Sequence, residues 1–441
     1  SGQGGWDSVN TVKIALLGAG TVGSGVIRTL SVNGETIAGR CGARIEIKKI
    51  LVRDAKKSRP EAEGIALTDN FDEILNDPEI SIVVEVMGGL MPAKDYMLRA
   101  MRAGKHVVTA NKDVIAERLR ELYGVADEHH VDFLYEGSVG GGIPIIKPLK
   151  ECLTANEISE VMGVINGTTN YMLTKMTEKH ISYDAVLRRA QEKGYAEANP
   201  SADVDGLDAA RKAAILASLA FDTIVEFEDV SVEGISHITE DDIEYGLNLG
   251  YVIKLLAVGR NTEEGIDVRV HPVFLPKTHP LASINGVFNA VFVRGNVIGE
   301  AMFYGRGAGS LPTASAVVAD VIEVTRDIVA GTTGRMKYRI GAKKKLCPVE
   351  KTHSSYYLRL VVADEPGVLG EIATTFGRAG VSLRSVIQAR STVSGDAEIV
   401  AVTHVVTHAD ASAAAAALQA LPVVREVRSL IRVADGQEDT L

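Results

Sequence analysis

Short apolar runs and amphipathic segments alternate along the first 140 residues. The apolar runs have the length of buried strands and cover residues 12–18, 45–52, 81–87, 105–109 and 132–135. Segments with helical periodicity lie between them. Strands that alternate with helices predict a parallel sheet with helices on its faces, the α/β class. A later apolar helix, at 313–328, is expected to pack back on this domain and to complete it with residues of about 311–335.

The pattern changes in residues 141–310. Strand-like segments are predicted there at 158–165, 253–259, 268–275 and 286–298, together with helices near 170–179, 183–193 and 205–221. We interpret this region as an α+β domain, in which helices cover one face of a sheet. A linker is predicted at 336–353. Residues 354–441 then follow the order β-α-β-β-α-β, which is the ferredoxin-like arrangement.

Composition narrows the class of protein. The 441 residues are 46% hydrophobic and 24% charged, as in a globular protein with real cores, and the net charge is −10. A negative charge of this size argues against a nucleic-acid or anionic-membrane surface. The three cysteines stand apart, without a zinc or disulfide spacing, and no apolar run has membrane-spanning length. We therefore expect a cytoplasmic protein.

A glycine-rich turn follows the first predicted strand. It reads Gly18-Ala-Gly20-Thr21-Val22-Gly23 and leads directly into a helix, which is expected to end near Leu30 before a polar, glycine-containing insert at 33–42. This motif between a strand and a helix predicts a dinucleotide site, because the helix N-terminus offers free N–H groups to a pyrophosphate. A glycine turn without a ligand is the alternative.

The second predicted strand ends in Arg53-Asp54. An arginine at this place suits the 2′-phosphate of NADP, whereas an acidic residue suits the ribose hydroxyl of NAD. Arg53 comes first and favours NADP, while Asp54 leaves NAD possible.

Residues 194–221 contain the strongest candidate for proton transfer. Their first half is turn-rich and acidic, and their second half is an apolar helix for which Asp205 is the expected N-cap. Asp208 and Lys212 lie four residues apart and share a face, which continues as Ile215 and Leu219. A carboxylate and an amine at the edge of an apolar wall suit acid–base chemistry. A merely structural ion pair is the alternative.

Two further turns carry candidate chemistry. Lys112 follows the fourth predicted strand, at the sheet edge where α/β proteins bind ligands, and it could neutralise an anionic group there. The turn Glu136-Gly-Ser-Val-Gly-Gly-Gly-Ile-Pro144 could direct backbone oxygens at a hard cation. A hinge between domains explains its glycines equally well.

Taken together, these stretches resemble homoserine dehydrogenase over essentially the whole chain. The matching motifs are GAGTVG (18–23), TANK (109–112), YEGSVGGGIPII (135–146), INGTTNYML (165–173), GYAEANPSADVDGLDAARKAAIL (194–216) and GRGAGSLPTASAVVAD (305–320). The segment from Tyr356, with DEPGVLGEIA at 364–373, is similar to an ACT domain. The resemblance thus implies a Rossmann-type dinucleotide-binding domain at 1–140, a catalytic and dimerisation domain at 141–310 and an ACT regulatory domain at 354–441.

The resemblance also implies roles for individual residues. Lys212 would be the proton donor, Glu197 and Asp208 would hold the amino group of the substrate, and Lys112 would lie near cofactor and substrate. Further cofactor positions implied by it are Arg53, Gly194 and Gly309. A monovalent cation, usually sodium, would be bound largely through backbone oxygens of Glu136, Val139, Gly141 and Ile143.

The implied activity is reversible NAD(P)H-dependent reduction of L-aspartate 4-semialdehyde to L-homoserine, in threonine, methionine and isoleucine biosynthesis. The resemblance further implies threonine as effector at the ACT domain and a homodimer or homotetramer. Two rival functions stay open at this point. One is a dehydrogenase for another semialdehyde or hydroxy acid, and the other is a non-catalytic amino-acid sensor with a vestigial nucleotide fold.

Overall fold

The computed structural model describes residues 10–335, 340–391 and 395–434. Residues 336–339 of the predicted linker and 435–441 of the predicted regulatory domain lie outside the described residues. The chain forms two compact units. The first comprises Ser1–Ile158, Ala214–Phe227 and Arg294–Lys343, and the second comprises Ser159–Ala213, Glu228–Val293 and Lys344–Leu441.

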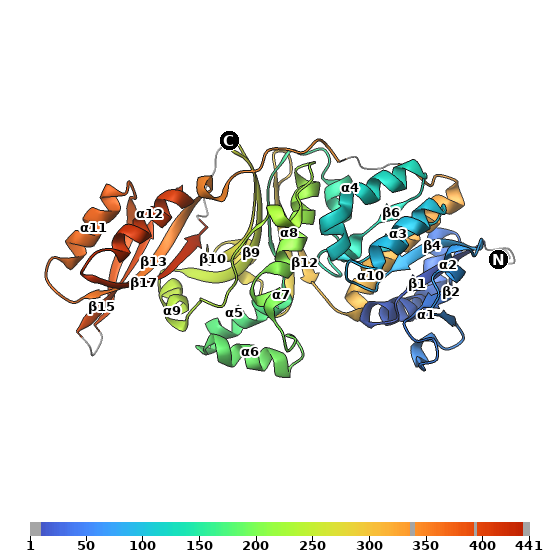
Figure 1. Ribbon diagram of the computed structural model, residues 1–441, viewed down its shortest axis with the longest axis horizontal. Coiled ribbons are helices and arrows are strands. Elements are labelled where there is room, and N and C mark those ends of the chain that lie inside the picture. The colour runs from blue at the N-terminus through green and yellow to red at the C-terminus, as the bar shows by residue number, and fades with distance from the viewer. Residues whose placement is uncertain (1–9, 336–339, 392–394, 435–441) are drawn as a thin grey trace, which may run out of the picture. The chain divides into compact units, whose positions relative to one another are not determined.

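The first unit is built on a parallel sheet. Its strands are β1 (Thr11–Leu17), β2 (Arg44–Leu51), β3 (Ala66–Thr68), β4 (Ile80–Glu85), β5 (His106–Thr109) and β6 (Phe133–Leu134). They lie in the order β3-β2-β1-β4-β5-β6, and all neighbours are parallel (Figure 1). The strand order reverses between β1 and β4. This reversal is the switch point at which doubly wound sheets bind ligands.

Helices cover both faces of this sheet. The helices α3 (Ala93–Arg102) and α4 (Lys112–Glu128) lie on one face, and α1 (Thr21–Cys41) and α10 (Ser310–Ala330) lie on the other (Figure 1). Buried Ile14, Leu16 and Val84 of the sheet form one core with Val317 and Val321 of α10. The α/β prediction for this part of the chain is confirmed.

One local prediction in this unit is wrong. The polar, glycine-containing segment 33–42 continues α1 instead of forming an insert. A Cβ at Gly34 or Gly39 would meet no atom within 4 Å, so these glycines face open space and weaken the helix only through their low helix propensity. Buried Ile37 and Cys41 hold the last turns against the core. Packing therefore overrides the local glycine signal.

The second unit contains a long mixed sheet. Its strands include β7 (Ile158–Val164), β9 (Tyr251–Thr262), β10 (Gly265–Pro276) and β11 (Phe288–Gly295), in the order β11-β7-β9-β10, while β8 (Ser231–Val232) pairs with β10. Its helices are α5 (Gly167–Lys179), α6 (Tyr183–Glu192), α7 (Ser201–Val204), α9 (Glu240–Asn248) and the first part of α8 (Leu207–Ala220). The predicted extended segment 286–298 is divided, because β11 ends at Gly295 and β12 (Gly299–Arg306) follows after a turn.

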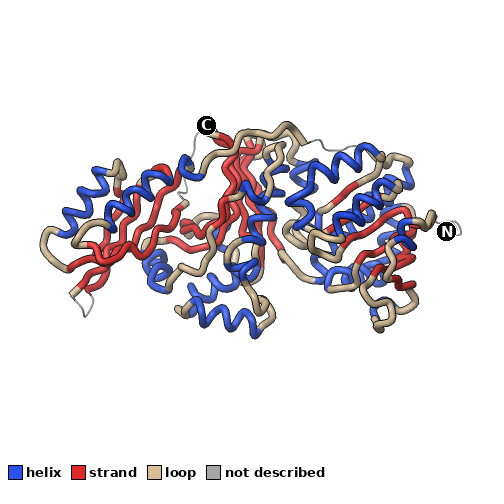
Figure 2. The backbone as a smooth tube through the Cα atoms, viewed as in Figure 1, coloured by secondary structure: helices blue, strands red, loops and turns tan. Residues whose placement is uncertain are grey.

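The C-terminal part of the second unit has the predicted β-α-β-β-α-β order. Its elements are β13 (His353–Ala363), α11 (Val368–Arg378), β14 (Leu383–Ser391), β15 (Asp396–Thr403), β16 (Val406–Thr407), α12 (His408–Gln419) and β17 (Val424–Val433). The strands β17-β13-β15-β14 are antiparallel neighbours. Figure 2 shows them in red beside blue helices. Because β17 also pairs with β10 through Arg432 and Val273, the C-terminal module continues the sheet of the second unit.

A buried ion network ties this module to α9. The guanidinium of Arg359 on β13 is 1% exposed, and its Nε donates to Asp242 of α9 at 2.8 Å. Its Nη1 donates to Glu398 of β15 at 3.0 Å. Asp242 also accepts from Ser429 of β17 at 2.7 Å. Buried charges persist only when paired and hydrogen-bonded, so these contacts fix α9 against the module.

Among the described residues, none of the helices combines the length and the apolar character needed to cross a membrane.

Candidate active site

The three motif glycines after β1 meet three different surroundings. Gly18 has φ +105°, and a Cβ there would lie 3.2 Å from the carbonyl oxygen of Val86. A Cβ at Gly23 would lie only 2.3 Å from the carbonyl oxygen of Gly18. A Cβ at Gly20, in contrast, would meet no atom within 4 Å. Gly18 thus allows a tight turn, and Gly23 allows close packing of the helix on the strand. Gly20 leaves open space for a pyrophosphate.

The start of α1 fits the same ligand. Gly20 is its N-cap, without a side-chain cap, and Thr21 and Val22 begin the helix. The first N–H groups of a helix have no partner inside it, and they carry the positive end of the helix dipole. The backbone here is therefore arranged to accept an anionic group such as a pyrophosphate.

The other predicted cofactor residues lie next to the ends of helices or strands. Arg53 is exposed directly after β2, as a contact to a 2′-phosphate would require. Gly309 has φ +126° and is the N-cap of α10, where it borders a hollow of about 1,120 Å³ that also reaches Ser24. Gly194 has φ +72° and is exposed after α6.

Lys112 is the first residue of α4, at the carboxyl edge of the parallel sheet. Asn111 caps this helix, because its side chain accepts from the N–H of Val114 at 3.3 Å. The Asn111 side chain also donates to the carbonyl of Gly89 in the loop after β4, at 2.7 Å. Lys112 is half-buried and thus stands at the ligand-binding edge that the sequence indicates.

The glycine-rich turn after β6 packs closely against two other segments. A Cβ at Gly137 would lie 3.0 Å from the Ala110 side chain, and one at Gly141 would lie 2.5 Å from the Gly307 carbonyl oxygen. Gly142 donates to the carbonyl of Arg306 at 3.1 Å. The glycines are thus required for close backbone approach, which a simple hinge would not need.

The carboxylate of Glu136 is already engaged. It accepts from the backbone N–H groups of Ile145, Ile146 and Lys147 at 2.6, 2.9 and 2.7 Å. Both carboxylate oxygens are thus already used within the turn. Carbonyl oxygens are the available ligands: among the described residues, those of Val139, Gly141 and Ile143 receive no hydrogen bond. The backbone N–H of Glu136 donates to Asp320. Burial of Asp320 and the nearby Glu136 carboxylate raise the pKa of the Asp320 carboxyl.

Because this turn packs closely against residues 306–307, adding a methyl group at Gly141 should destabilise the protein. We expect Gly141→Ala to lower the free energy of unfolding by about 1–3 kcal/mol, since it overpacks the Gly307 carbonyl and places alanine at φ +55°. Gly124→Ala is the matched control, because a Cβ at Gly124 meets nothing within 4 Å. Chemical denaturation of both variants measures the difference. Equal stability of the two would contradict the close packing.

The predicted proton-transfer pair is formed within the second unit. The Lys212 nitrogen donates to Asp208 Oδ2 at 2.7 Å and to the carbonyl of Ile165 at 2.9 Å. The two side chains are 12% and 13% exposed, respectively. The amine therefore lies in a half-closed environment, where a carboxylate and a carbonyl oxygen hold it.

Asn166 is a site residue that the sequence did not reveal. Its side-chain amide donates to Asp208 at 3.0 Å and to Asp203 at 2.7 Å, while its carbonyl oxygen caps α5 by accepting from Thr169. This residue joins the end of β7 to the carboxylates of the focal stretch. Its position before Gly-Thr-Thr, typical of a helix cap, was the available signal, but the partners lie 37 and 42 residues away.

The start of the focal helix differs from the prediction. Asp205 does not cap it, because residues Ser201–Val204 form the short helix α7 and α8 begins only at Leu207. Gly206, at φ +83°, makes the turn between them, and a Cβ there would lie 3.0 Å from Val232. Glu197 is exposed in the loop before α7. The structure thus unites Asp208, Lys212 and Asn166.

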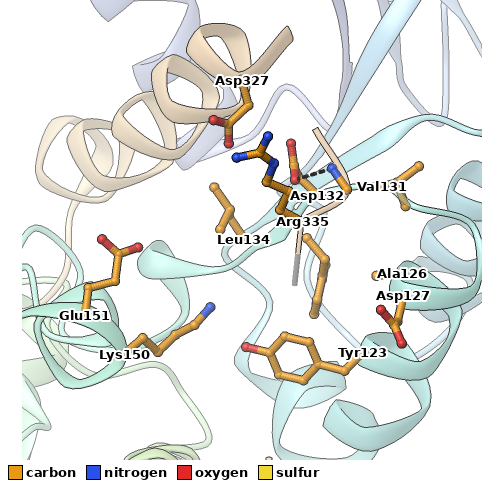
Figure 3. Close-up of a pocket in the computed structure, with 12 residues that line it drawn as sticks. Tyr123, Ala126, Asp127, Val131, Asp132, Leu134, Lys150, Glu151, Asp327 and Arg335 are labelled. Carbon is orange, nitrogen blue, oxygen red and sulfur yellow. Dashed lines mark hydrogen bonds between the residues drawn. The ribbon is translucent and has the colours of Figure 1, made fainter. Parts of the chain in front are cut away.

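A separate small cavity lies in the first unit (Figure 3). It has a volume of about 50 Å³, with Tyr123 and Lys150 on one side and Asp327 and Arg335 on the other. The Lys150 nitrogen lies 5.4 Å from the Tyr123 ring and 5.2 Å from the Tyr135 ring. The space suits water molecules rather than a dinucleotide, and none of the predicted site residues lines it.

Three regions of the chain match models of known protein families. Residues 18–136 match the NAD-binding domain of homoserine dehydrogenase, residues 144–322 match homoserine dehydrogenase itself, and residues 356–423 match the ACT domain.

Individual relatives give the same result. A homoserine dehydrogenase of Synechocystis is 47% identical, over 96% of this chain and 99% of its own, and one of Bacillus subtilis is 42% identical over the same shares. The crystal structure of a homoserine dehydrogenase from Thiobacillus denitrificans has a TM-score of 0.92 at 41% identity, covering 97% of this chain and 99% of that one. A hyperthermophilic archaeal homoserine dehydrogenase in complex with NADPH has a TM-score of 0.62 at 27% identity, covering 71% and 98%. The chain therefore belongs to the homoserine dehydrogenase family of NAD(P)-dependent oxidoreductases, which act on a CH–OH group, and it carries a C-terminal ACT domain.

Proposed function

We propose that Lys212 is the proton donor in the reversible NAD(P)H-dependent reduction of L-aspartate 4-semialdehyde to L-homoserine. The observation that carries this proposal is the way in which the lysine nitrogen is held. An ammonium has three N–H groups, and two of them are used by Asp208 and Ile165. Among the described residues no third acceptor lies within hydrogen-bond distance of this nitrogen. The third N–H is thus available for the carbonyl oxygen of a substrate.

The proton transfer follows from this geometry. The bound nicotinamide would supply a hydride to the aldehyde carbon, and the substrate oxygen takes a proton from Lys212. The N–H bond of the lysine breaks as the O–H bond of the alcohol forms. Lys212 is then neutral beside Asp208 and is recharged by solvent. Oxidation of homoserine requires the neutral amine first, so that direction is favoured at alkaline pH.

We assign substrate binding to the neighbouring polar groups. Asp208 and Glu197 would accept hydrogen bonds from the substrate ammonium, with Asn166 fixing Asp208 by its 3.0 Å hydrogen bond. Glu197 is exposed and free to meet a ligand from solvent. Lys112, half-buried at the start of α4, would balance negative charge of cofactor or substrate.

A steady-state assay tests the proposed reaction. Purified protein is mixed with NADPH and L-aspartate 4-semialdehyde, and the loss of NADPH absorbance is compared with the L-homoserine formed. We expect one homoserine for each NADPH oxidised. Succinic semialdehyde, which lacks the amino group, is the matched substrate and should react far more slowly. Equal rates with both would contradict the assignment of the two carboxylates.

NADP is the proposed cofactor, with NAD as a weaker substitute. Exposed Arg53 after β2 supports this preference. We expect Arg53→Ala to raise the KM for NADPH by about 10-fold and to leave the KM for NADH unchanged, because a charge-assisted hydrogen bond to the 2′-phosphate is lost. Lys56→Ala, an exposed change three residues away, is the control. A parallel rise of both KM values in Arg53→Ala would refute the assignment.

A monovalent cation, most simply Na⁺, is proposed at the turn 136–143. The carbonyl oxygens of Val139, Gly141 and Ile143, which have no donor among the described residues, support this site, and the Glu136 carbonyl would be the fourth ligand. Such a cation would hold the turn against residues 306–307. We derive no catalytic step from it.

Regulation and assembly are proposed on two further features. The ACT domain would take L-threonine as effector, and the Arg359–Asp242 network gives it a rigid connection to α9.

β12 is an edge strand with Met302 42% and Tyr304 54% exposed, which supports a homodimer or homotetramer formed by copies of this chain.

A further inference from the structure

Glu85 is a buried carboxylate at the carboxyl end of β4, next to the switch point of the parallel sheet. Its exposure is 0%, and no basic side chain is among its hydrogen-bond partners in the described residues. Burial raises the pKa of Glu85, and hydrogen bonds from Thr109 and from two backbone N–H groups oppose this shift. A carboxylate buried without a cation is costly unless its oxygens are satisfied. One Glu85 oxygen is satisfied by the loop after β4 and the other by Thr109, the last residue of β5.

The first oxygen holds the loop after β4. Glu85 Oε1 accepts from the backbone N–H of Met87 at 2.8 Å and from that of Gly88 at 3.2 Å. This loop contacts the dinucleotide motif directly, because a Cβ at Gly18 would lie 3.2 Å from both the Val86 carbonyl oxygen and the Met87 side chain. The position of the glycine turn therefore depends on where residues 86–88 lie.

The second oxygen holds the loop after β5. Glu85 Oε2 accepts from the hydroxyl of Thr109 at 2.6 Å, and the Thr109 oxygen accepts from the Asn111 N–H at 3.0 Å. Asn111 then caps α4, which Lys112 begins, and its side chain returns to the Gly89 carbonyl. The hydrogen bonds form a closed circuit through both loops. The strand register agrees, since Leu17, Glu85 and Thr109 stand side by side at the ends of β1, β4 and β5.

We propose that Glu85 is a positioning residue for the cofactor: it fixes the loops after β4 and β5 as one rigid edge that holds the dinucleotide turn and the start of α4 in binding geometry. This inference rests on the dinucleotide site of the proposed function, but not on the identity of the substrate. A leucine would fill the same space at lower desolvation cost, so the carboxylate is retained for its hydrogen bonds.

Three variants and one control test this role. Glu85→Ala removes both acceptors. Glu85→Gln keeps one oxygen for the two backbone N–H groups and turns an N–H₂ group toward Thr109. Thr109→Val removes only the link to the second loop. Thr325→Val is the matched control, because the Thr325 hydroxyl is buried in α10 without a partner in the described residues.

The readout is the Kd for NADPH, measured by fluorescence titration of the full chain after circular dichroism has confirmed folding. We expect Glu85→Ala to raise this Kd by about 10-fold or more, since two buried N–H groups lose their acceptor, and Thr109→Val to raise it by about 3-fold. Glu85→Gln should stay within about 3-fold of the unaltered protein, and Thr325→Val should match it.

A purely structural role would give a different result. Folded Glu85→Ala would then melt at lower temperature but bind NADPH with unaltered Kd, which would overturn the proposal, as would a Glu85→Gln variant that binds as weakly as Glu85→Ala. If Glu85→Ala does not fold, Thr109→Val decides, and an unaltered Kd in that variant refutes the role. Since the titration needs no turnover, failure of the unaltered protein to reduce aspartate semialdehyde would count against the proposed function alone.

Discussion

Replacing Lys212 with alanine is expected to lower the turnover number for aspartate semialdehyde reduction by about 10²–10⁴-fold, the range of a lost general acid. The Kd for NADPH should not change, because the lysine nitrogen contacts Asp208 and Ile165 rather than the glycine turn. Rapid mixing gives the rate of the chemical step, and fluorescence titration gives the Kd.

Lys179→Ala is the matched control for this variant. Lys179 is exposed at the end of α5, so its loss removes a positive charge of the same kind from the same unit without touching the pair. We expect it to retain full turnover. A Lys212→Ala variant within 3-fold of this control would show that some other group protonates the substrate.

Replacing Gly20 with valine is expected to weaken NADPH binding by about 10–100-fold while the protein folds normally, since overpacking a well-fitted site costs about 1–3 kcal/mol. A Cβ at Gly20 meets no protein atom within 4 Å, and its backbone angles of φ −84° and ψ −155° suit an ordinary residue. The added methyl groups would therefore occupy only the space that we assign to the pyrophosphate.

Gly34→Val provides the comparison within the same helix. A Cβ there also meets nothing within 4 Å, but Gly34 lies in the middle of α1, beyond the turn that binds the anion. Both variants should show unchanged thermal unfolding to within a few degrees, and only Gly20→Val should lose affinity. Equal NADPH affinity of the two would place the pyrophosphate elsewhere.

The sequence predicts those features that depend on neighbouring residues. The apolar run of β1, the glycines after it and the amphipathic start of α1 are all local, and the structure confirms the strand–turn–helix they indicate. The same holds for the β-α-β-β-α-β order of the C-terminal module. Asp208 and Lys212 could be paired from their spacing alone, because one helix positions both.

Contacts between distant segments were not predictable from these local signals. Asn166 reaches Asp208 across 42 residues, and Glu85 joins Thr109 across 24. A charged residue within the apolar run SIVVEVM marks Glu85 as unusual, but it does not identify the loops that the carboxylate holds. The sequence likewise could not show that Glu136 uses its carboxylate to bind three backbone N–H groups.

Two boundary errors have the same physical cause. Gly34 and Gly39 suggested that α1 ends early, and the acidic turn before α8 suggested a cap at Asp205. Buried Ile37 and Cys41 extend the first helix, and the close packing of Gly206 against Val232 sets the start of the second. Tertiary packing in both cases outweighs propensities of less than about 1 kcal/mol per residue.

Chemical rescue of Lys212→Ala by small primary amines tests the central claim most directly. The cavity left by the lysine side chain would admit methylammonium or ethylammonium beside Asp208 and the Ile165 carbonyl, the two acceptors that held the original nitrogen. We predict that the rate of aspartate semialdehyde reduction by Lys212→Ala rises with amine concentration and then saturates. The saturated rate should be at least about 10-fold above that of the variant without amine. A rate that stays at the level of the variant without amine, while NADPH binding remains intact, would contradict the role of Lys212 as the proton donor.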